Sequence, residues 1–298
     1  MIIGVKKLKF KGGSAVSDRK IALVTGSSSG FGLLTALALA ENGCHVIAAM
    51  RNLQKKEDLM RKAKQNGVSQ RVECRALDVN DVHSIRKIVH EIIENYGRID
   101  VLVNNAGISL GGFVEEVPLE DWRRVMETNF FGMVALTQET LPHMRKAASG
   151  NIINIGSVSG RIGFPGYGPY AASKFAVGGF SESLRLEMLP YGVHVSIIEP
   201  GAYQTAIWSK GFDYFAAIKK ENSPYQNHLD SILNYSKKTA ASAGDPMEIA
   251  ETVVRIVQAR RPKFRYVLGK GTKTAVMGKA LLPWKWFEQI ILHQLEKK

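Results

Sequence analysis

The stretch KIALVTGSSSGFGLLTALALAENG, from Lys20 to Gly43, decides the fold of this chain. It begins as an apolar run of strand length, turns through a glycine-rich segment at residues 26–32, and continues with good helix formers. Residues 26–30 match G-x-S-x-G, the strand-to-helix elbow that exposes the nucleophilic serine of many hydrolases. The same turn also suits a loop that carries a phosphate. Ser28 is therefore either a nucleophile or part of a nucleotide-binding loop.

Apolar runs of strand length alternate with helix-length periodic segments along most of the chain. Seven runs predict strands: IALVT, HVIAAM, VECRAL, DVLVNN, NIINIG, HVSIIEP and FRYVLG, which begin at positions 21, 45, 72, 100, 151, 194 and 264. Several are continuous Val/Ile/Leu runs, as in parallel strands buried on both faces. Residues 82–96 predict a helix that Asp81 caps and Gly97 ends. The alternation predicts an α/β fold: a doubly wound parallel sheet of Rossmann type, with about seven strands and helices on both faces.

The positive charge of the chain is concentrated at its two ends. The net charge is +13, of which residues 1–20 carry +5 and residues 255–298 carry +9, so the body is at −1. This distribution disfavours a nucleic-acid face built into the fold, and we expect no nucleic-acid partner. We predict a basic leader at 1–19, one catalytic domain at 20–268 with an insertion at about 203–245, and a basic amphipathic extension at 269–298.

Apolar runs in this sequence are shorter than the ~18–20 residues of a membrane span, and the amino end lacks the apolar core of a secretory signal. We therefore expect a cytoplasmic protein, with contact to the inner membrane face as a further option. The two cysteines, Cys44 and Cys74, do not form a disulfide framework. No His/Cys/Asp cluster has ligand spacing, so no metal is expected.

The position of the glycine-rich turn decides between the two interpretations of Ser28. A hydrolase elbow normally follows several strands, whereas a dinucleotide-binding loop follows the first strand of the sheet, as this turn does. We therefore interpret the turn as a nucleotide-binding loop. Further polar motifs follow later strands: NNAG at 104–107, Ser157 after NIINIG, Tyr170 and Lys174 in YAASK, and the EPG that closes HVSIIEP. All of them fall at carboxyl ends of strands, where open α/β sheets bind ligands.

These motifs, in this order, resemble the short-chain dehydrogenase/reductase family, in the branch with TGxxxGxG and YxxxK. The resemblance covers about residues 20–268, and the patterns AMRN and GPYAASKFAV are similar to those of hydroxysteroid and retinol dehydrogenases. It implies hydride transfer between a nicotinamide cofactor and a small molecule. A second YxxxK, Tyr266 and Lys270, spans a predicted strand and a glycine turn, so we interpret it as chance.

The resemblance implies four catalytic residues: Asn129, Ser157, Tyr170 and Lys174. A tyrosine with a pKa of ~10 is a poor acid-base catalyst at neutral pH, and Lys174, one helical turn from Tyr170, is the cation expected to lower that pKa. In the family, this lysine also holds the nicotinamide ribose. Ser157 is expected to bind the carbonyl oxygen, and Asn129 a water that links Lys174 to solvent. Alternatively, Asn129 is a buried amide that satisfies a helix kink.

The end of the second predicted strand indicates which cofactor is bound. It ends at Met50 without the acidic residue that binds the ribose of NAD, and Arg51 follows, which can pair with a 2′-phosphate. We expect NADP(H) rather than NAD(H), unless Arg51 is only a solvated side chain. The expected cofactor-binding residues are Gly26, Ser27, Ser28, Gly30, Phe31, Gly32, Arg51, Asp78, Val79, Asn104, Ala106, Gly107, Tyr170, Lys174, Pro200, Gly201 and Thr205.

The insertion is rich in aromatic and apolar side chains, which suits a lid over an apolar alcohol, ketone or aldehyde. Alternatively, these side chains belong to the core or to an interface; they are Tyr203, Ile207, Trp208, Phe212, Tyr214 and Phe215. The expected function is that of an NADP(H)-dependent carbonyl reductase or alcohol dehydrogenase, assembled as a homodimer or homotetramer. The alternative is a catalytically idle NADP-sensing or interaction module on the same fold.

The carboxyl-terminal segment LLPWKWFEQIILHQLEKK predicts an amphipathic helix that begins near Pro283. Trp284, Phe287, Ile291 and Leu295 recur at helical spacing and form one apolar stripe. Such a helix either packs on its own domain or across a homo-oligomer, or it lies on an anionic membrane surface.

Overall fold

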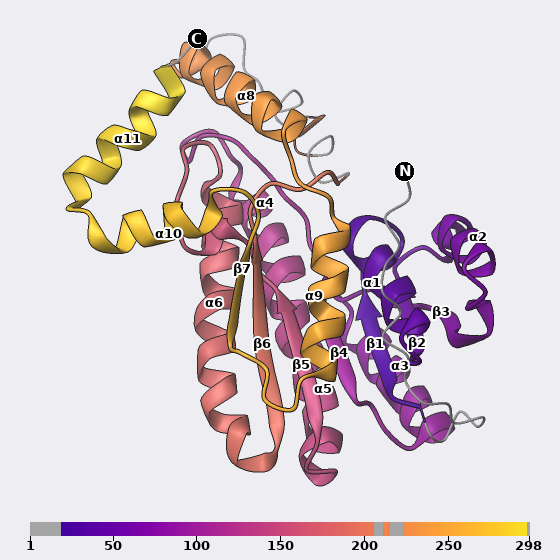
Figure 1. The fold of residues 1–298 in the computed structure, drawn as a ribbon. Helices are drawn as coiled ribbons and strands as arrows, with labels where there is room; N and C mark the ends of the chain where they lie inside the picture. The colour runs from indigo at the N-terminus through magenta and orange to yellow at the C-terminus, as the bar shows by residue number, and fades with distance from the viewer. Residues whose placement is uncertain (1–18, 206–210, 212, 215–222, 297–298) are drawn as a thin grey trace, which may run out of the picture.

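The computed structural model describes residues 19–205, 211, 213–214 and 223–296, so nearly all of the predicted basic leader lies outside it. Figure 1 shows a parallel sheet with helices on both faces. Within the described residues the sheet has seven strands in the order β3-β2-β1-β4-β5-β6-β7, which confirms the predicted fold class. They are β1 (Ile21–Thr25), β2 (His45–Met50), β3 (Val72–Ala76), β4 (Val101–Asn104), β5 (Gly150–Ile155), β6 (Val193–Pro200) and β7 (Arg265–Leu268).

The strand order reverses next to β1, and this reversal positions the candidate site. The chain moves outward from β1 to β2 and β3, and then returns to place β4 on the other side of β1. Val24 of β1 accordingly pairs with Ala48 of β2 on one side and with Val103 of β4 on the other. Helices that leave two such strands turn to opposite faces of the sheet, so a crevice opens beyond the carboxyl ends of β1 and β4.

Two helical layers cover the sheet. One core cluster joins the sheet to α1, α2 and α9, and the other joins it to α3, α5 and α6. Both are mainly aliphatic, as expected where parallel strands are buried on both faces. The longer helices are α1 (Gly30–Glu41), α2 (Glu57–Gln65), α3 (Val82–Tyr96), α4 (Leu119–Met126), α5 (Gly132–Lys146), α6 (Gly168–Met188), α8 (Gln226–Ala241), α9 (Met247–Gln258), α10 (Thr272–Leu281) and α11 (Trp284–Glu296).

Helix α3 begins and ends where its sequence predicts. The Asp81 carboxylate accepts a hydrogen bond from the backbone N–H of His83 at 2.9 Å, which satisfies one free donor of the first turn. Gly97 ends the helix in the left-handed region, with a φ of +72°. The apolar stripe between these caps, with Ile85 and Val89 among its members, is buried against the sheet.

Helices α8, α10 and α11 lie beyond the two layers, near the carboxyl ends of the strands (Figure 1). Helix α8 belongs to the predicted insertion, and α10 and α11 follow β7. In the part of the chain that the structure describes, no helix has both the length and the apolar character needed to cross a membrane.

Candidate active site

The loop between β1 and α1 has a backbone that requires glycine. Gly26 and Gly30 have φ values of +67° and +56°, in the left-handed region that side chains disfavour. A Cβ added to Gly32 would lie 2.4 Å from the carbonyl oxygen of Gly26, so the turn closes only without a side chain there. The first N–H groups of α1 lack intrahelical acceptors and can bind a phosphate. The loop therefore fits the pyrophosphate of a dinucleotide.

The end of β4 is tied to this loop by Asn105, which the sequence analysis did not single out. Its side-chain amide donates to the carbonyl of Thr25 at 2.8 Å. The Thr25 hydroxyl in turn accepts from the backbone N–H groups of Asn105 and Ala106, both at 2.9 Å. These bonds hold the NNAG segment against the glycine loop across the crevice. The NNAG motif was recognisable in the sequence, but it is the side chain of its second asparagine, Asn105, that contacts the end of β1.

Two residues that are expected to bind the cofactor, Ser27 and Asn104, form side-chain hydrogen bonds within the protein. The Ser27 hydroxyl is buried and donates to the carbonyl of Val24 at 2.7 Å. The buried Asn104 amide donates to Asn154 at 2.9 Å and to Thr137 at 3.1 Å, on neighbouring elements of the sheet and α5. Both side chains therefore already have partners within the protein, and a contact of these residues with a nucleotide stays a prediction. Each of these side chains bonds to a buried polar group near the end of a strand. A sequence pattern cannot distinguish such a structural hydrogen bond from a bond to a ligand.

The remaining expected cofactor residues lie around the crevice. Arg51 is exposed directly after β2. Asp78 follows β3, and its carboxylate accepts from the backbone N–H of Asn80 at 3.0 Å. Other members lie beside the loop or at strand ends: Ser28, Phe31, Val79, Gly107, Pro200, Gly201 and Thr205. A Cβ on Gly30 would be 3.7 Å from Thr205, so the chain after β6 contacts the glycine loop.

Tyr170, Lys174 and Ser157 come together at the carboxyl end of β5. Tyr170 and Lys174 are one turn apart on α6, and the Lys174 ammonium is 5.7 Å from the centre of the Tyr170 ring. The ammonium is buried and donates to the carbonyl of Ile155 at 2.9 Å. Ser157 begins the short 3-10 helix after β5, where its hydroxyl accepts from the backbone N–H of Ser159 at 3.0 Å. Three of the four expected catalytic residues thus share one place.

Burial is the largest cause of the pKa shifts of Tyr170 and Lys174. It lowers the pKa of Lys174 from 10.5 to about 8. It also raises the pKa of Tyr170 above its ordinary value, while a hydrogen bond with Ser157 acts in the opposite direction. Burial thus sets the net direction for Tyr170, and the lowering of its pKa by Lys174 stays a prediction. Desolvation of the phenolate is the largest cause of this rise.

Asn129 lies in a π-helical segment, Glu127–Phe131, between α4 and α5. Its fully buried amide accepts from the N–H of Ile108 and donates to the carbonyl of the same residue, both at 2.8 Å. It also donates to the hydroxyl of Ser173 at 3.0 Å, next to Lys174. The sequence predicted one long helix here and did not predict the bulge. Asn129 therefore holds the loop after β4 against α6. This arrangement resembles the alternative interpretation, in which Asn129 is a buried amide that satisfies a helix kink.

Aromatic pairs join the insertion to the loops after β4 and β5. Tyr225 stacks on Phe113 with ring centres 4.3 Å apart, and Tyr235 of α8 stacks on Phe164 at 5.1 Å. The Tyr167 hydroxyl lies 3.0 Å from the hydroxyl of Ser236. The sequence analysis missed these residues, although Phe113 and Phe164 follow strand ends as the recognised motifs do. We call Phe113, Phe164, Tyr167, Tyr225 and Tyr235 the aromatic surface; its Tyr167 is three residues before Tyr170 and acts on the Tyr170 pKa.

The predicted lid residues have different locations. Tyr203 is a core residue: it is buried, packs edge-on against Phe31, and its hydroxyl donates to Glu248 at 2.6 Å. This corrects the interpretation of Tyr203 as part of a lid and agrees with the alternative of a core aromatic. Tyr214 donates a hydrogen bond to Asp121 of α4. The others, Ile207, Trp208, Phe212 and Phe215, lie outside the described residues.

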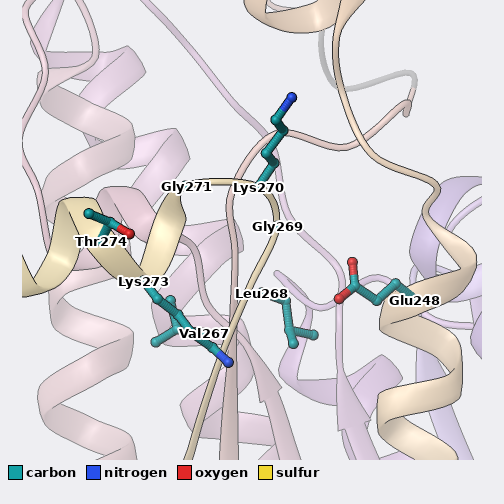
Figure 2. A pocket seen from close by; sticks show the side chains of 8 residues that line it. All are labelled: Glu248, Val267, Leu268, Gly269, Lys270, Gly271, Lys273 and Thr274. Atoms are coloured by element: carbon teal, nitrogen blue, oxygen red, sulfur yellow. The ribbon is translucent and has the colours of Figure 1, made fainter.

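Residues of α9, of β7 and of the segment after β7 line a hollow (Figure 2). Its lining residues are Glu248, Val267, Leu268, Gly269, Lys270, Gly271, Lys273 and Thr274, none of which belongs to the expected catalytic set. The chance YxxxK motif borders it. The Tyr266 hydroxyl accepts from the N–H of Lys263 before β7, whereas Lys270 follows the strand's other end. The two side chains do not converge, as the sequence analysis predicted.

Metal and thiol groups offer no second reactive centre in the described ranges. No group of three or more His, Cys, Asp or Glu side chains is placed there to hold a metal ion. Cys44 and Cys74 are both unpaired. Burial raises the pKa of the Cys44 thiol to about 11, which keeps it in the unreactive protonated form.

Comparison with known sequences places this chain among oxidoreductases. The family model described as short chain dehydrogenase matches residues 20–214. The uncharacterized oxidoreductase YusZ of Bacillus subtilis is 43% identical over 279 residues, which are 93% of this chain and 99% of that protein. The 3-ketodihydrosphingosine reductase of Bacteroides thetaiotaomicron is 38% identical over 84% of this chain and 88% of its own length. Human retinol dehydrogenase 8 is 35% identical over 83% and 80%.

Solved structures of the same fold include two with a bound nicotinamide cofactor. A short-chain dehydrogenase from Streptomyces avermitilis has a TM-score of 0.76 and 33% identity, covering 88% of this chain and 93% of its own. An actinorhodin polyketide ketoreductase variant with NADPH has a TM-score of 0.72 and 30% identity, over 86% and 98%. A Burkholderia phymatum protein with NAD has a TM-score of 0.76 over 92% and 96%, and at 24% identity it shares the fold alone.

Proposed function

This chain belongs to the short chain dehydrogenase family, and we propose that it is an NADP(H)-dependent oxidoreductase acting on an apolar alcohol, ketone or aldehyde. One observation carries the proposal: Tyr170 and Lys174 lie on one face of α6 beside Ser157, at the sheet edge where the glycine loop opens. An acid-base tyrosine there, together with a nucleotide-binding loop, suits hydride transfer. A module that only senses a nucleotide has no need of such a tyrosine.

The bound nicotinamide supplies or accepts the hydride, and the chain's own residues manage the proton. In reduction, the Tyr170 hydroxyl donates its proton to the developing alkoxide oxygen of the substrate. The raised pKa keeps this hydroxyl protonated at neutral pH, as a general acid requires. The Ser157 hydroxyl hydrogen-bonds the same oxygen and fixes its position before the proton moves.

Lys174 and Asn129 support the role of Tyr170 in two different ways. The Lys174 ammonium stabilises negative charge on the tyrosine oxygen once the proton has left. Its bond to the carbonyl of Ile155 fixes it at the end of β5, and the family resemblance implies that it would also hold the nicotinamide ribose. Asn129 is a positioning residue, because its amide holds Ile108 and Ser173 on either side of the catalytic group.

The preference for NADP(H) rests on the end of β2. Met50 is buried, no acidic residue follows it, and Arg51 is exposed at the crevice, which favours a cofactor with a 2′-phosphate. The partly exposed hydroxyl of Ser28 offers a second contact, in place of the buried Ser27. Neighbouring structures hold NADPH or NAD, so this preference depends on the residues of this chain.

The apolar substrate class rests on the aromatic surface next to Tyr170. The paired rings of Phe113 with Tyr225 and of Phe164 with Tyr235 offer stacked apolar faces, with the carboxylate of Glu115 at the Tyr225 hydroxyl. Two relatives carry names that state lipid substrates, 3-ketodihydrosphingosine and retinol. These names support the same class for this chain, without choosing one compound.

The proposal is tested by following the oxidation of NADPH and of NADH by absorbance, with a panel of apolar ketones and aldehydes and a matched panel of charged ones. We expect turnover of apolar compounds with NADPH, and weaker turnover with NADH. Tight NADPH binding without turnover of any compound would favour the idle sensing module instead. Turnover confined to charged compounds would contradict the apolar substrate class.

A further inference from the structure

The two helices after β7 leave large apolar side chains in water. We define the C-terminal arm as residues 272–296, which form α10 and α11. In Figure 1 it projects from the body as a hook, and α11 reaches back to α8. Phe287 is buried, but the arm exposes a series of apolar side chains: Met277 (60% exposed), Leu281 (78%), Trp284 (65%), Trp286 (60%), Ile290 (45%) and Leu292 (48%).

This exposure differs from the predicted stripe. Phe287 and the partly buried Ile291 pack inward, as expected, whereas Trp284 stays exposed. The side chain of Leu295 lies outside the described residues. The helix thus packs on its own chain and still presents apolar groups on its other sides. Trp286 and Ile290, four residues apart, form one exposed apolar pair.

One kind of partner suits both the exposed apolar side chains of the arm and its positive charge. The arm carries three lysines and two glutamates, a net charge of +1, and the flanking Lys270, Lys297 and Lys298 bring the segment 269–298 to +4. Packing two copies arm against arm would bring like charges together. An anionic lipid surface instead attracts lysines and accepts tryptophan and aliphatic side chains at the level of its headgroups. We propose that the C-terminal arm docks this protein on anionic membrane surfaces.

The root of the arm places this surface beside the candidate active site. Lys279 of α10 donates to the carbonyl of Arg161, just after the Ser157 turn, and lies 5.0 Å from the ring of Phe175, the residue after Lys174. At the other end, α11 contacts α8, which carries Tyr235 of the aromatic surface. A membrane under the arm would therefore lie next to the helices that border the substrate region.

The test is co-sedimentation of the full chain with phosphatidylcholine vesicles, with and without phosphatidylglycerol. We expect at least tenfold stronger binding to the anionic vesicles at low salt, and release by added salt. The double variant Trp284→Ser/Trp286→Ser should lose at least tenfold in binding. Leu186→Ser, which replaces a 71%-exposed leucine on α6 outside the arm, should bind as the wild type does.

Charge is tested separately. Lys285→Glu changes the charge of the arm by two units and should weaken binding about tenfold or more, whereas Lys87→Glu on α3 should have less effect. Quenching of wild-type tryptophan fluorescence by brominated lipids tests insertion without any variant. The proposal is overturned if the wild type does not sediment with anionic vesicles at low salt. It is also overturned if the tryptophan variant sediments unchanged, or if it changes only the oligomeric mass, which would make the arm a contact between copies.

Discussion

Replacing Lys174 by methionine separates the catalytic role of this side chain from its effect on stability. Lys174 is 6% exposed, and burial lowers its pKa from 10.5 to about 8. Because one pKa unit corresponds to about 1.4 kcal/mol, keeping this lysine charged destabilises the native state by about 3 kcal/mol at pH 7. Methionine removes that cost, but it also removes the hydrogen bond to Ile155, worth about 1 kcal/mol at any pH.

The direction of this pH dependence follows from whether the native or the unfolded state binds the proton of Lys174. Below about pH 8 the lysine is charged in both states, so the destabilisation is constant. Between pH 8 and 10.5 the unfolded chain binds a proton that the native state has released, so wild-type stability rises with pH. The stability advantage of Lys174→Met should therefore shrink by about 2–3 kcal/mol between pH 7 and pH 10.

The assay is urea unfolding of wild type and variant at pH 7 and pH 10, with Lys87→Met, an exposed lysine on α3, as the matched control. We expect the pH-dependent difference for Lys174→Met only, together with lost turnover and weakened cofactor binding. A stability difference that stays constant from pH 7 to pH 10 would refute the picture of Lys174 as a buried cation.

Three further results are expected. Gly32→Ala should weaken NADPH binding at least tenfold in a titration, because its Cβ would lie 2.4 Å from the Gly26 oxygen; unchanged affinity would contradict the tight loop. Arg51→Asp should lower the kcat/KM ratio for NADPH over NADH by about one to two orders of magnitude, unlike Lys64→Asp; equal wild-type use of both cofactors would refute the proposed preference. The reduction rate should fall as pH rises through about 8, where Lys174 loses its charge, and a rate that is flat to pH 10 would contradict that role.

The fold could be predicted from the sequence because its signals are local. Mainly apolar runs of strand length identified all seven strands of the described sheet, and the caps of α3 lie at Asp81 and Gly97 as predicted. The grouping of Tyr170 with Lys174 could also be predicted, since residues four apart share a helix face. Ser157 joins them because motifs at carboxyl ends of parallel strands meet at one edge of the sheet.

Other features depend on contacts between distant segments. Whether Asn104 binds a ligand or Asn154 depends on the pairing of β4 with β5, which the motif does not state. The π-helical turn at Asn129 depends on its bonds to Ile108 and Ser173, on other elements. The pKa of Tyr170 follows burial by the assembled fold. Such features require three-dimensional neighbours, so sequence patterns predict the residue type there but not its partner.

The most direct measurement of the central claim uses Tyr170→Phe, which removes one hydroxyl and leaves the ring in place. NADPH binding is measured by fluorescence titration, and turnover by NADPH oxidation with the best apolar ketone. Our account predicts that the dissociation constant stays within about threefold of wild type. It predicts that turnover falls by about 10²–10⁴-fold, as expected for the loss of a general acid. A Tyr170→Phe enzyme that keeps most of its turnover would contradict the proposed mechanism.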